Sequence, residues 1–216
     1  MMKHFKNIFV IFETKKQKFN FKTKHKFEIK REKFEKKILI NSKILKKISL
    51  KVFNDVNSTN SIKFIKKIKP NVVITFGVGL IKKKFLSLFK KNNIINLHGG
   101  NPEEYRGLDS ILWSLYHKDF DNLYTTLHYI DEKFDTGKII SKLNIPLNKK
   151  TKFEHIRFYN TINCVKLIKN YLKKLIMKKK IISFKQKKIG RYYSAIPAKL
   201  IDISIKNFHL YIKKLK

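Results

Sequence analysis

Apolar residues along the chain form short runs of strand length, and these runs alternate with segments of helical spacing. The runs expected to be strands are Asn7–Phe12, Ile38–Ile40, Asn71–Phe76, Asn93–Leu97, Asn122–Ile130 and Lys138–Leu143. The segments expected to be helices are Ser61–Lys69, Leu80–Phe89, Leu108–His117, Thr151–Lys179 and Ile201–Leu215. This alternation is typical of an α/β domain with a mostly parallel central sheet and helices on both faces.

Two of these segments have the composition of buried strands. Asn7–Phe12 is apolar at consecutive positions, which predicts burial on both faces, and the β-branched run at Asn71–Phe76 suits a central parallel strand. The charged segment Lys15–Lys37 lacks clear periodicity and predicts a loop with some exposed helix. The long helix is expected to bury a stripe made of Phe153, Ile156, Ile162, Val165, Ile168, Leu172 and Leu175.

Length and composition indicate a folded protein with one substantial domain. The 216 residues are 43% hydrophobic, which is enough for a core. We expect a main domain at residues 1–180 and a short C-terminal appendage at 181–216, packed on the core or at an oligomer interface. The one cysteine, Cys164, excludes an internal disulfide and predicts a buried apolar side chain on a helix.

The net charge of +36 raises the question of a nucleic-acid partner, because lysine and arginine neutralise phosphates. Only four of the 51 basic residues are arginine, however, and nucleic-acid readers use the planar fork of arginine as well. The lysines are spread over the whole chain together with isoleucine, asparagine and phenylalanine, which all have AT-rich codons. Codon bias therefore explains the charge better than a nucleic-acid partner does, although a basic surface attracts any anionic substrate.

No apolar run is long enough to span a membrane, which takes about 18 or more consecutive apolar residues. The run at Ile8–Phe12 is too short for a signal peptide. It is followed by Glu13-Thr14-Lys15-Lys16, which lacks the small residues of a cleavage site. We expect a cytoplasmic protein without membrane insertion.

Six of the seven glycines lie between Gly77 and Gly137, where the candidate catalytic residues also occur. Gly77 follows one predicted strand, Asn96 and His98 end the next, and Asp135 lies in a loop 37 residues after His98. In doubly wound sheets ligands bind at the carboxyl ends of the strands, so these residues can converge. An amide, an imidazole and a carboxylate together can stabilise an oxyanion and move a proton.

Other interpretations of these residues have less support. An aspartic protease needs two Asp-Thr-Gly motifs, and this chain has one, at Asp135. His98, His117 and His128 lack the spacing and acidic neighbours of a zinc site, so no metal is expected. The chain contains no Walker loop and no Gly-X-Gly-X-X-Gly, which disfavours nucleotide triphosphate and dinucleotide chemistry.

Taken together, these motifs resemble the folate-dependent formyltransferase family. The motifs are Phe76-Gly77-Val78-Gly79-Leu80 after a strand, Asn96-Leu97-His98, Tyr105-Arg106-Gly107, and His128 seven residues before Asp135. The resemblance covers residues 71–147 and implies a Rossmann-like formyltransferase domain. It also implies transfer of a formyl group from 10-formyltetrahydrofolate to an amine, without a metal.

The resemblance assigns a role to each motif. Asn96 and His98 would stabilise the oxyanion formed when an amine attacks the formyl carbon. Asp135 would hold His98 protonated and assist proton transfer, and His128 would brace the Asp135 loop. The residues implied to hold the pterin are Phe76, Gly77, Val78, Gly79, Leu80, Lys133, Phe134 and Gly137.

The acceptor implied by the resemblance is the amine of a nucleotide-linked amino sugar. Family members that act on methionyl-tRNA or on a purine-pathway ribonucleotide usually carry Ser-Leu-Leu-Pro after the histidine, whereas this chain has Gly99–Gly107 there. That segment and Gly190–Ser194 look like the sugar N-formyltransferases of surface-polysaccharide pathways. The residues expected to contact the sugar are Asn101, Glu103, Tyr105 and Arg106. Arg106 is equally suited to pinning its loop through a structural salt bridge.

Two alternatives remain open. The first is a methionyl-tRNA formyltransferase-like enzyme, although such an enzyme is expected to be longer and to carry a separate tRNA-binding barrel. The second, from a different class, is a basic RNA-binding protein without catalysis. Members of the formyltransferase family are often dimers, and the apolar segment Ile201–Leu215 could supply a homodimer interface.

Overall fold

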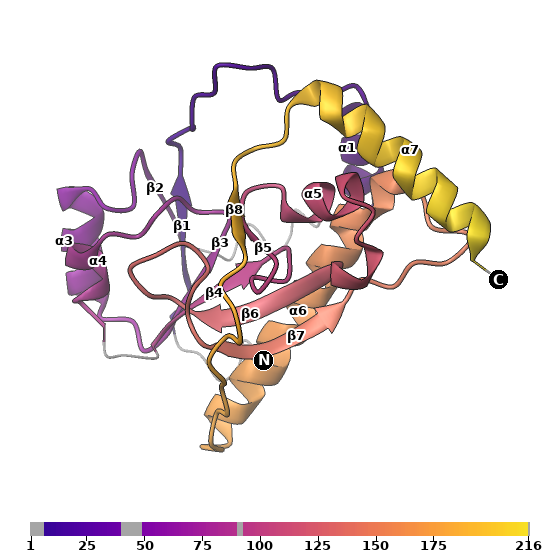
Figure 1. Cartoon of the computed structure of the whole chain (residues 1–216). Helices are drawn as coiled ribbons and strands as arrows, with labels where there is room; N and C mark the ends of the chain where they lie inside the picture. The colour runs from indigo at the N-terminus through magenta and orange to yellow at the C-terminus, as the bar shows by residue number, and fades with distance from the viewer. Residues whose placement is uncertain (1–6, 40–48, 90–92, 216) are drawn as a thin grey trace.

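A four-stranded sheet with the order β3-β4-β6-β7 forms the middle of the fold (Figure 1). The computed structural model describes residues 7–39, 49–89 and 93–215. The four strands are β3 (Val73–Phe76), β4 (Ile94–His98), β6 (Tyr124–Tyr129) and β7 (Ile139–Asn144). β3 and β4 are parallel, whereas β6 runs antiparallel to both β4 and β7.

Two short pairs of parallel strands accompany this sheet. β1 (Phe9–Glu13) pairs with β2 (Ser49–Phe53), and β5 (Tyr105–Gly107) pairs with β8 (Arg191–Tyr193). The α/β class predicted from the sequence is confirmed. The four-stranded sheet itself is mixed because β6 and β7 are joined by a short connection, which permits only antiparallel pairing.

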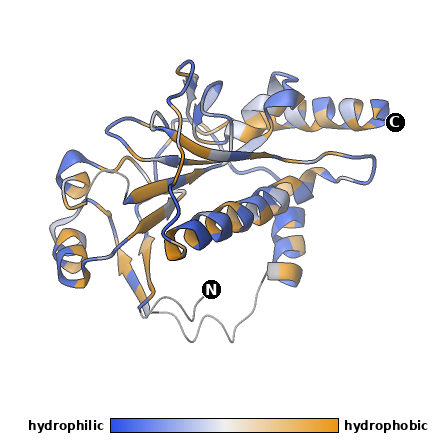
Figure 2. Ribbon diagram, turned by 90° about the horizontal axis from the view of Figure 1, so that it is seen from below, coloured by the Kyte–Doolittle hydropathy of each residue, from blue (hydrophilic) through white to orange (hydrophobic). Residues whose placement is uncertain are grey.

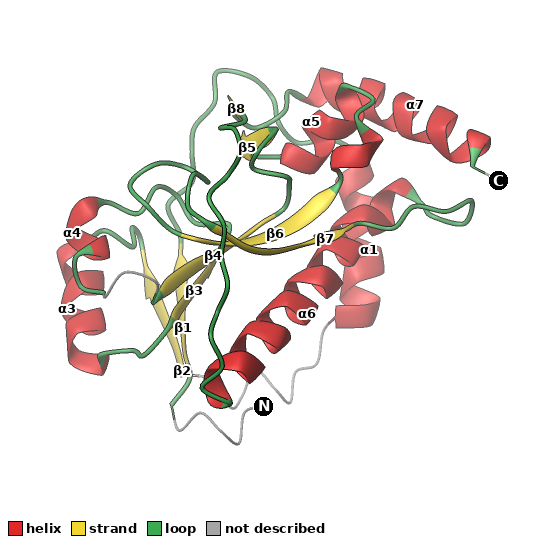
Figure 3. Ribbon diagram, turned by 60° about the horizontal axis from the view of Figure 1, so that its bottom comes forward, coloured by secondary structure: helices red, strands yellow, loops and turns green. Residues whose placement is uncertain are grey.

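Helices surround the sheet (Figure 3). The α-helices are α1 (Phe27–Leu39), α3 (Thr59–Ile68), α4 (Lys83–Leu86), α5 (Ser110–Tyr116), α6 (Ile156–Ile176) and α7 (Ala198–Lys214). The 3₁₀ helices are η2 (Phe120–Asn122) and η3 (Phe153–His155). Local sequence sets the ends of α3: the Ser58 hydroxyl accepts the Ser61 N–H at its start, and Pro70 follows its end.

Different helices cover the two faces of the sheet, because successive residues of a strand point to opposite sides. Ile95 and Leu97 of β4 pack with Cys164 and Leu167 of α6 in one core cluster. Ile94 packs instead with residues of α3 and α4 in a second cluster. Figure 2 shows α6 running along the sheet, with hydrophobic and hydrophilic residues both present on the helix. Helices therefore lie on both faces, as predicted.

The C-terminal part of the chain packs against the rest of the fold. Phe208 and Ile212 of α7 lie in a third core cluster with Leu115 of α5. Before α7, β8 pairs with β5, and Phe184 forms an isolated bridge with Ile139 of β7. The division of the chain into two units at residue 180 stays a prediction.

The prediction that the first strand is buried on both faces is wrong. The side chains of Phe9, Val10 and Phe12 are 39, 38 and 58% exposed. Within the described residues β2 is the only strand that pairs with β1, and a pocket of about 440 Å³ lies between β1 and β3. Among the described residues, the apolar run therefore has no second neighbouring strand, which full burial requires.

Other boundaries also differ from the sequence predictions. Ile38 belongs to α1 rather than to a strand, residue 40 lies outside the described residues, and β2 was missed. β3, expected to be a central strand, is an edge strand of the four-stranded sheet. The helix expected at Leu80–Phe89 is limited to the four residues of α4. On α6, Val165 is 58% exposed, while Asn160 and Asn163 are buried and bond to Thr125 and to the Asn144 carbonyl.

Candidate functional site

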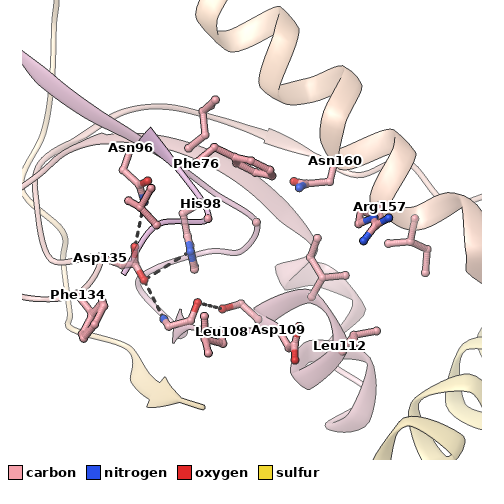
Figure 4. A pocket seen from close by; sticks show the side chains of 18 of the residues that line it. Phe76, Asn96, His98, Leu108, Asp109, Leu112, Phe134, Asp135, Arg157 and Asn160 are labelled. Atoms are coloured by element: carbon pink, nitrogen blue, oxygen red, sulfur yellow. Dashed lines mark hydrogen bonds and ion pairs between the residues drawn. The ribbon is translucent and has the colours of Figure 1, made fainter. Parts of the chain in front are cut away.

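Polar residues of three strands meet beside Asn96 of β4, and Figure 4 shows Asn96 and His98 next to Asp135. Asn96 pairs in register with Thr75 of β3 and with His128 of β6. The Thr75 hydroxyl donates to the Asn96 side-chain oxygen at 2.7 Å, which fixes the orientation of the amide. The amide nitrogen therefore faces the other way, 3.2 Å from His128 Nε2 and 3.3 Å from Asp135 Oδ1.

His98, the last residue of β4, is buried in the same cluster. Its Nε2 lies 2.8 Å from the carbonyl oxygen of Tyr105, and because a carbonyl only accepts, this nitrogen carries hydrogen. Its Nδ1 lies 3.5 Å from Asp135 Oδ2. The close approach of the chain to this ring requires Gly100, where a Cβ would come within 2.7 Å of Nε2.

Asp135 links the two histidines. Its Oδ1 lies 3.3 Å from His128 Nε2, and its Oδ2 accepts the Gly107 N–H at 2.8 Å. Asp135 has a φ of 54°, a left-handed backbone conformation that is uncommon outside glycine. Such a conformation persists only where the surrounding contacts hold it.

Segments distant in sequence supply those contacts. The Gln186 amide nitrogen donates to the carbonyl oxygens of Asp135 and Gly137 at 2.7 and 2.9 Å. Arg106 donates through Nη1 to the Phe134 carbonyl at 3.0 Å, and through Nε to a carbonyl of the C-terminal segment at 2.6 Å. The segment after residue 180 therefore shapes the loop that carries Asp135.

Burial and charge act in opposite directions on the two ionisable partners. Burial by itself would raise the pKa of the Asp135 carboxyl, but the neighbouring histidines and the Gly107 N–H lower it below its usual value. Burial lowers the pKa of His98 and outweighs the opposite effect of Asp135. The carboxylate therefore stays ionised, and it stabilises a proton that arrives at His98 Nδ1.

Two pockets meet at this cluster. The larger, of about 440 Å³, reaches from Asp135 to residues of α1 and α6. The smaller, of about 50 Å³, lies between residues 78–81 and residues 130–135. Asn96, Phe134 and Asp135 line both pockets. The polar cluster thus stands where two cavities adjoin, an arrangement suited to transfer of a group between two bound molecules.

Comparison with known proteins gives the family. A family model described as Formyl transferase matches residues 2–159, well over half of the chain. The chain belongs to the formyl transferase family. The family resemblance expected from residues 71–147 is confirmed and extends over a longer stretch.

The curated relatives of this chain include enzymes named for different acceptors. The methionyl-tRNA formyltransferase of Thermodesulfovibrio yellowstonii is 34% identical over 95 residues, which are 44% of this chain and 30% of the relative. The GDP-perosamine N-formyltransferase of Brucella melitensis biotype 1 is 31% identical over 94 residues, which are 43% of this chain and 36% of the relative. The match therefore spans less than half of the length of either relative.

Solved structures share the fold at low sequence identity. PseJ from Anoxybacillus kamchatkensis, in complex with UDP-4,6-dideoxy-4-formamido-L-AltNAc and tetrahydrofolate, has a TM-score of 0.56 at 23% identity. The match covers 94% of this chain and 91% of PseJ. The N-formyltransferase from Helicobacter canadensis, in complex with folinic acid and dTDP-3-aminofucose, has a TM-score of 0.54 at 18% identity, over 89% of this chain and 80% of its own.

Most residues predicted to hold the pterin line at least one of the two pockets. They are Phe76, Gly77, Val78 and Phe134 in the larger pocket and Val78, Gly79, Leu80, Lys133 and Phe134 in the smaller. Gly137 lines neither, and a Cβ there would overlap the Tyr129 carbonyl. Glycine at this position lets the Asp135 loop pass close to the backbone that follows β6.

The four residues predicted to contact the sugar are absent from the described lining of both pockets. Other groups of the protein form hydrogen bonds with their polar atoms. Asn101 bonds to Asn122, and Tyr105 bonds to Asp119. Glu103 accepts from Lys142 and from the Lys187 N–H, and Arg106 donates to the Phe134 and Gly190 carbonyls. These four side chains shape the region between β4 and α5. Arg106 pins its loop through two backbone carbonyls, and among the described residues it does not form the salt bridge considered from the sequence. A direct sugar contact of any of the four stays a prediction.

Sequence reasoning missed several residues of the site. They are Thr75, Gln186, Arg31, Arg157 and Asn160. The position of Thr75 follows once β3 and β4 are placed in parallel register beside Asn96. The others carry no local signal, because they reach the site from helices or from the C-terminal segment.

Two classes of feature are absent from the described part of the chain. Residues 7–39, 49–89 and 93–215 contain no group of three or more His, Cys, Asp or Glu that could hold a metal ion. Across the same ranges no helix has the length and apolar character to cross a membrane.

Cys164 is buried on α6, as predicted, and burial raises the pKa of its thiol to about 11.

Proposed function

We propose that this protein is an N-formyltransferase that moves a formyl group from 10-formyltetrahydrofolate to the amine of a nucleotide-linked amino sugar. One observation carries the proposal: the cluster of Asn96, Asp135 and the buried His98 lies at the junction of two pockets. A formyl donor held along the walls that residues 76–80 and Phe134 form in these pockets, and an amine that enters the larger pocket, would meet at these side chains.

The loops around the cluster fit a folate ring. Gly77, with a φ of 63°, has open space where a Cβ would stand, so the backbone is accessible to a flat ligand. The Glu13 carboxylate steadies this loop, accepting the Gly79 N–H at 3.2 Å and the Val56 N–H at 3.0 Å. The folate compounds named for PseJ and for the Helicobacter canadensis enzyme support the same assignment.

The side chains supply the charge stabilisation and the proton route that formyl transfer needs. When bound, 10-formyltetrahydrofolate supplies the formyl carbon. Attack by an amine places negative charge on the formyl oxygen. The Asn96 amide is the donor for it, and His98, once it has taken up the proton of the amine, adds positive charge beside it. The amine must also lose a proton, and the released folate nitrogen gains one. His98 Nδ1 and Asp135 Oδ2, 3.5 Å apart, form the route for that proton.

A sugar acceptor is favoured by the relative named GDP-perosamine N-formyltransferase and by the ligands named for the two structures. Methionyl-tRNA is the second candidate acceptor, since the relative from Thermodesulfovibrio yellowstonii, at 34% identity, is named for it. Both acceptors present a primary amine, so they require the same three catalytic side chains.

A panel of acceptors tests the proposal. Purified protein is mixed with 10-formyltetrahydrofolate and, separately, with nucleotide-linked amino sugars and with charged initiator tRNA, and tetrahydrofolate release is followed. We expect release with an amino sugar, and at least about a 100-fold loss of turnover in His98→Ala with folate binding retained. His209→Ala, which removes an exposed histidine of α7, is the control. Absence of release with every acceptor would contradict the proposal, and release with tRNA alone would transfer it to the second candidate.

A further inference from the structure

Arg31 of α1 has unused hydrogen-bonding capacity beside the larger pocket. Its side chain is only 15% exposed, yet its Nε has no hydrogen-bond partner among the described residues. Its one acceptor there is Glu28, 3.4 Å from Nη2, which is a long contact. A buried donor without a partner costs free energy, so this guanidinium is poised for an acceptor that enters from the pocket.

A second guanidinium lines the same end of the pocket. Arg157 of α6 is held by Glu35 through Nε at 2.7 Å and through Nη2. Figure 4 shows Arg157 and Asn160 on the α6 side of the pocket, across from His98. Two positive charges held near each other repel unless a negative charge lies between them, and burial together with Arg157 lowers the pKa of Arg31.

The acidic groups nearby leave the pocket side positive. Glu28 and Glu35 pair with the guanidiniums but are absent from the described pocket lining. Asp109 does line the pocket; its Oδ2 accepts the Ile196 N–H at 3.0 Å, and burial raises the pKa of its carboxyl. At this end of the pocket two guanidiniums therefore face one carboxylate, Asp109, whose charged form burial disfavours; the other carboxylate of the lining, Asp135, lies with His98 at the far end.

The scarcity of arginine in this chain makes these positions informative. Only four of the 51 basic residues are arginine, so a basic position chosen for charge alone is nearly always lysine. Arg31 and Arg157 line the pocket, and Arg106 pins the Asp135 loop. Arginine offers a planar fork of N–H groups that matches two phosphate oxygens, which lysine does not.

We propose that Arg31 and Arg157 form an anion subsite that binds the diphosphate of the nucleotide-linked acceptor. This inference rests on the acceptor class of the proposed function. The diphosphate would lie at the α1–α6 end of the pocket, with the sugar amine directed toward His98 and Asp135 at the other end. The two guanidiniums thereby set which acceptors bind, while the chemistry stays with the polar cluster.

Binding of nucleoside diphosphates tests the subsite without requiring turnover. UDP, GDP and dTDP are each titrated alone into the wild-type protein and into Arg31→Gln, Arg31→Lys and Arg191→Gln by calorimetry. We expect at least one diphosphate to bind the wild-type protein. Both Arg31 variants should bind it at least about tenfold more weakly than the wild type, because a hydrogen bond to a charged group is lost. Arg191→Gln removes the same charge from an exposed position outside the described pocket lining and should change affinity by less than about twofold.

Several results would overturn the subsite. One is that the wild-type protein binds none of the three diphosphates. Another is that Arg31→Gln and Arg191→Gln weaken diphosphate affinity equally. Wild-type affinity in Arg31→Lys would overturn the role of the guanidinium fork, and this variant keeps the charge if Arg31→Gln fails to fold. The two proposals can fail separately. If diphosphate binding depends on Arg31 but no formyl transfer occurs, the subsite stands and the proposed function fails. If formyl transfer occurs but substitution of Arg31 does not affect it, only the subsite is overturned.

Discussion

The side-chain amide of Gln186 donates to the main-chain carbonyl of Asp135 at 2.7 Å. It donates to the Gly137 carbonyl as well, at 2.9 Å, and so spans the turn in which Asp135 has its left-handed conformation. Gln186 lies outside the residues 2–159 that match the family model. The C-terminal segment therefore helps to position the Asp135 carboxylate.

Gln186→Leu should impair catalysis more than it impairs folding. Loss of the amide leaves two carbonyls unpaired, which costs about 1–3 kcal/mol of stability, and lets Asp135 move. We expect kcat for formyl transfer to fall about 10- to 100-fold with a smaller change in KM, because misplacement of a catalytic group acts on the chemical step.

Asn207→Leu is the matched control for Gln186→Leu. The Asn207 amide also spans two carbonyls, those of Leu115 and Tyr116, at 3.1 and 2.9 Å, and it is buried to a similar degree. Urea unfolding should show comparable losses of stability in the two variants, with kcat lowered only by Gln186→Leu. Equal losses of kcat would show that Gln186 acts through general stability.

Arg106→Lys separates the two roles considered for this residue. If Arg106 braces the Asp135 loop, Arg106→Lys should lower kcat, because lysine does not bridge two carbonyls in the same way. The KM for the acceptor should then change by less than about twofold. A direct sugar contact predicts instead a raised KM. Steady-state kinetics on Arg106→Lys and on Arg191→Lys, an exposed substitution of the same type, distinguish these results.

Gly137→Ala should destabilise the protein where Gly79→Ala does not. A Cβ at Gly137 overlaps the Tyr129 carbonyl, which is backbone and does not move aside easily. The nearest atom to a Cβ at Gly79 is Glu13 Oε2 at 3.8 Å, an ordinary contact. We expect a loss of about 1–3 kcal/mol in the free energy of unfolding for Gly137→Ala and little change for Gly79→Ala. Similar unfolding midpoints for both variants would contradict this account of the loop.

The protonation of His98 should make the fold sensitive to mild acid. Burial lowers the pKa of His98 in the folded protein, so the unfolded chain takes up the proton first as the pH falls. Stability is then complete above about pH 6.5 and is lost as the pH falls toward the folded-state pKa. His98→Gln lacks this group, and its stability should depend less on pH, by at most about 1.4 kcal/mol per pH unit.

Urea unfolding at a series of pH values measures this difference. The exposed His209→Gln substitution serves as a control and should follow the wild-type dependence. If His98→Gln loses as much stability as the wild type between about pH 7.5 and about pH 5.5, His98 does not titrate in the folded protein as inferred.

The residues that carry the proposed chemistry were predictable because they lie in short motifs at strand ends. Asn96 and His98 end a strand that its own apolar pattern identifies, and Asp135 sits in a glycine turn at a recognisable distance. Burial of the first strand was not predictable in the same way. An apolar run shows that a strand can be buried, whereas the packing of neighbouring elements decides whether it is. One side of β1 faces a pocket, so β1 stays partly exposed.

The sequence by itself determined the α/β class, most strand and helix positions, the three proposed catalytic residues and the family resemblance. These depend on periodicity and on motifs within a few residues of each other, where covalent connection limits the arrangements. Only the tertiary structure decided that Gln186 holds Asp135, that Arg106 pins its loop, and that Arg31 and Arg157 share a pocket wall. Contacts between residues 28 or more positions apart depend on register and packing, which no local pattern encodes.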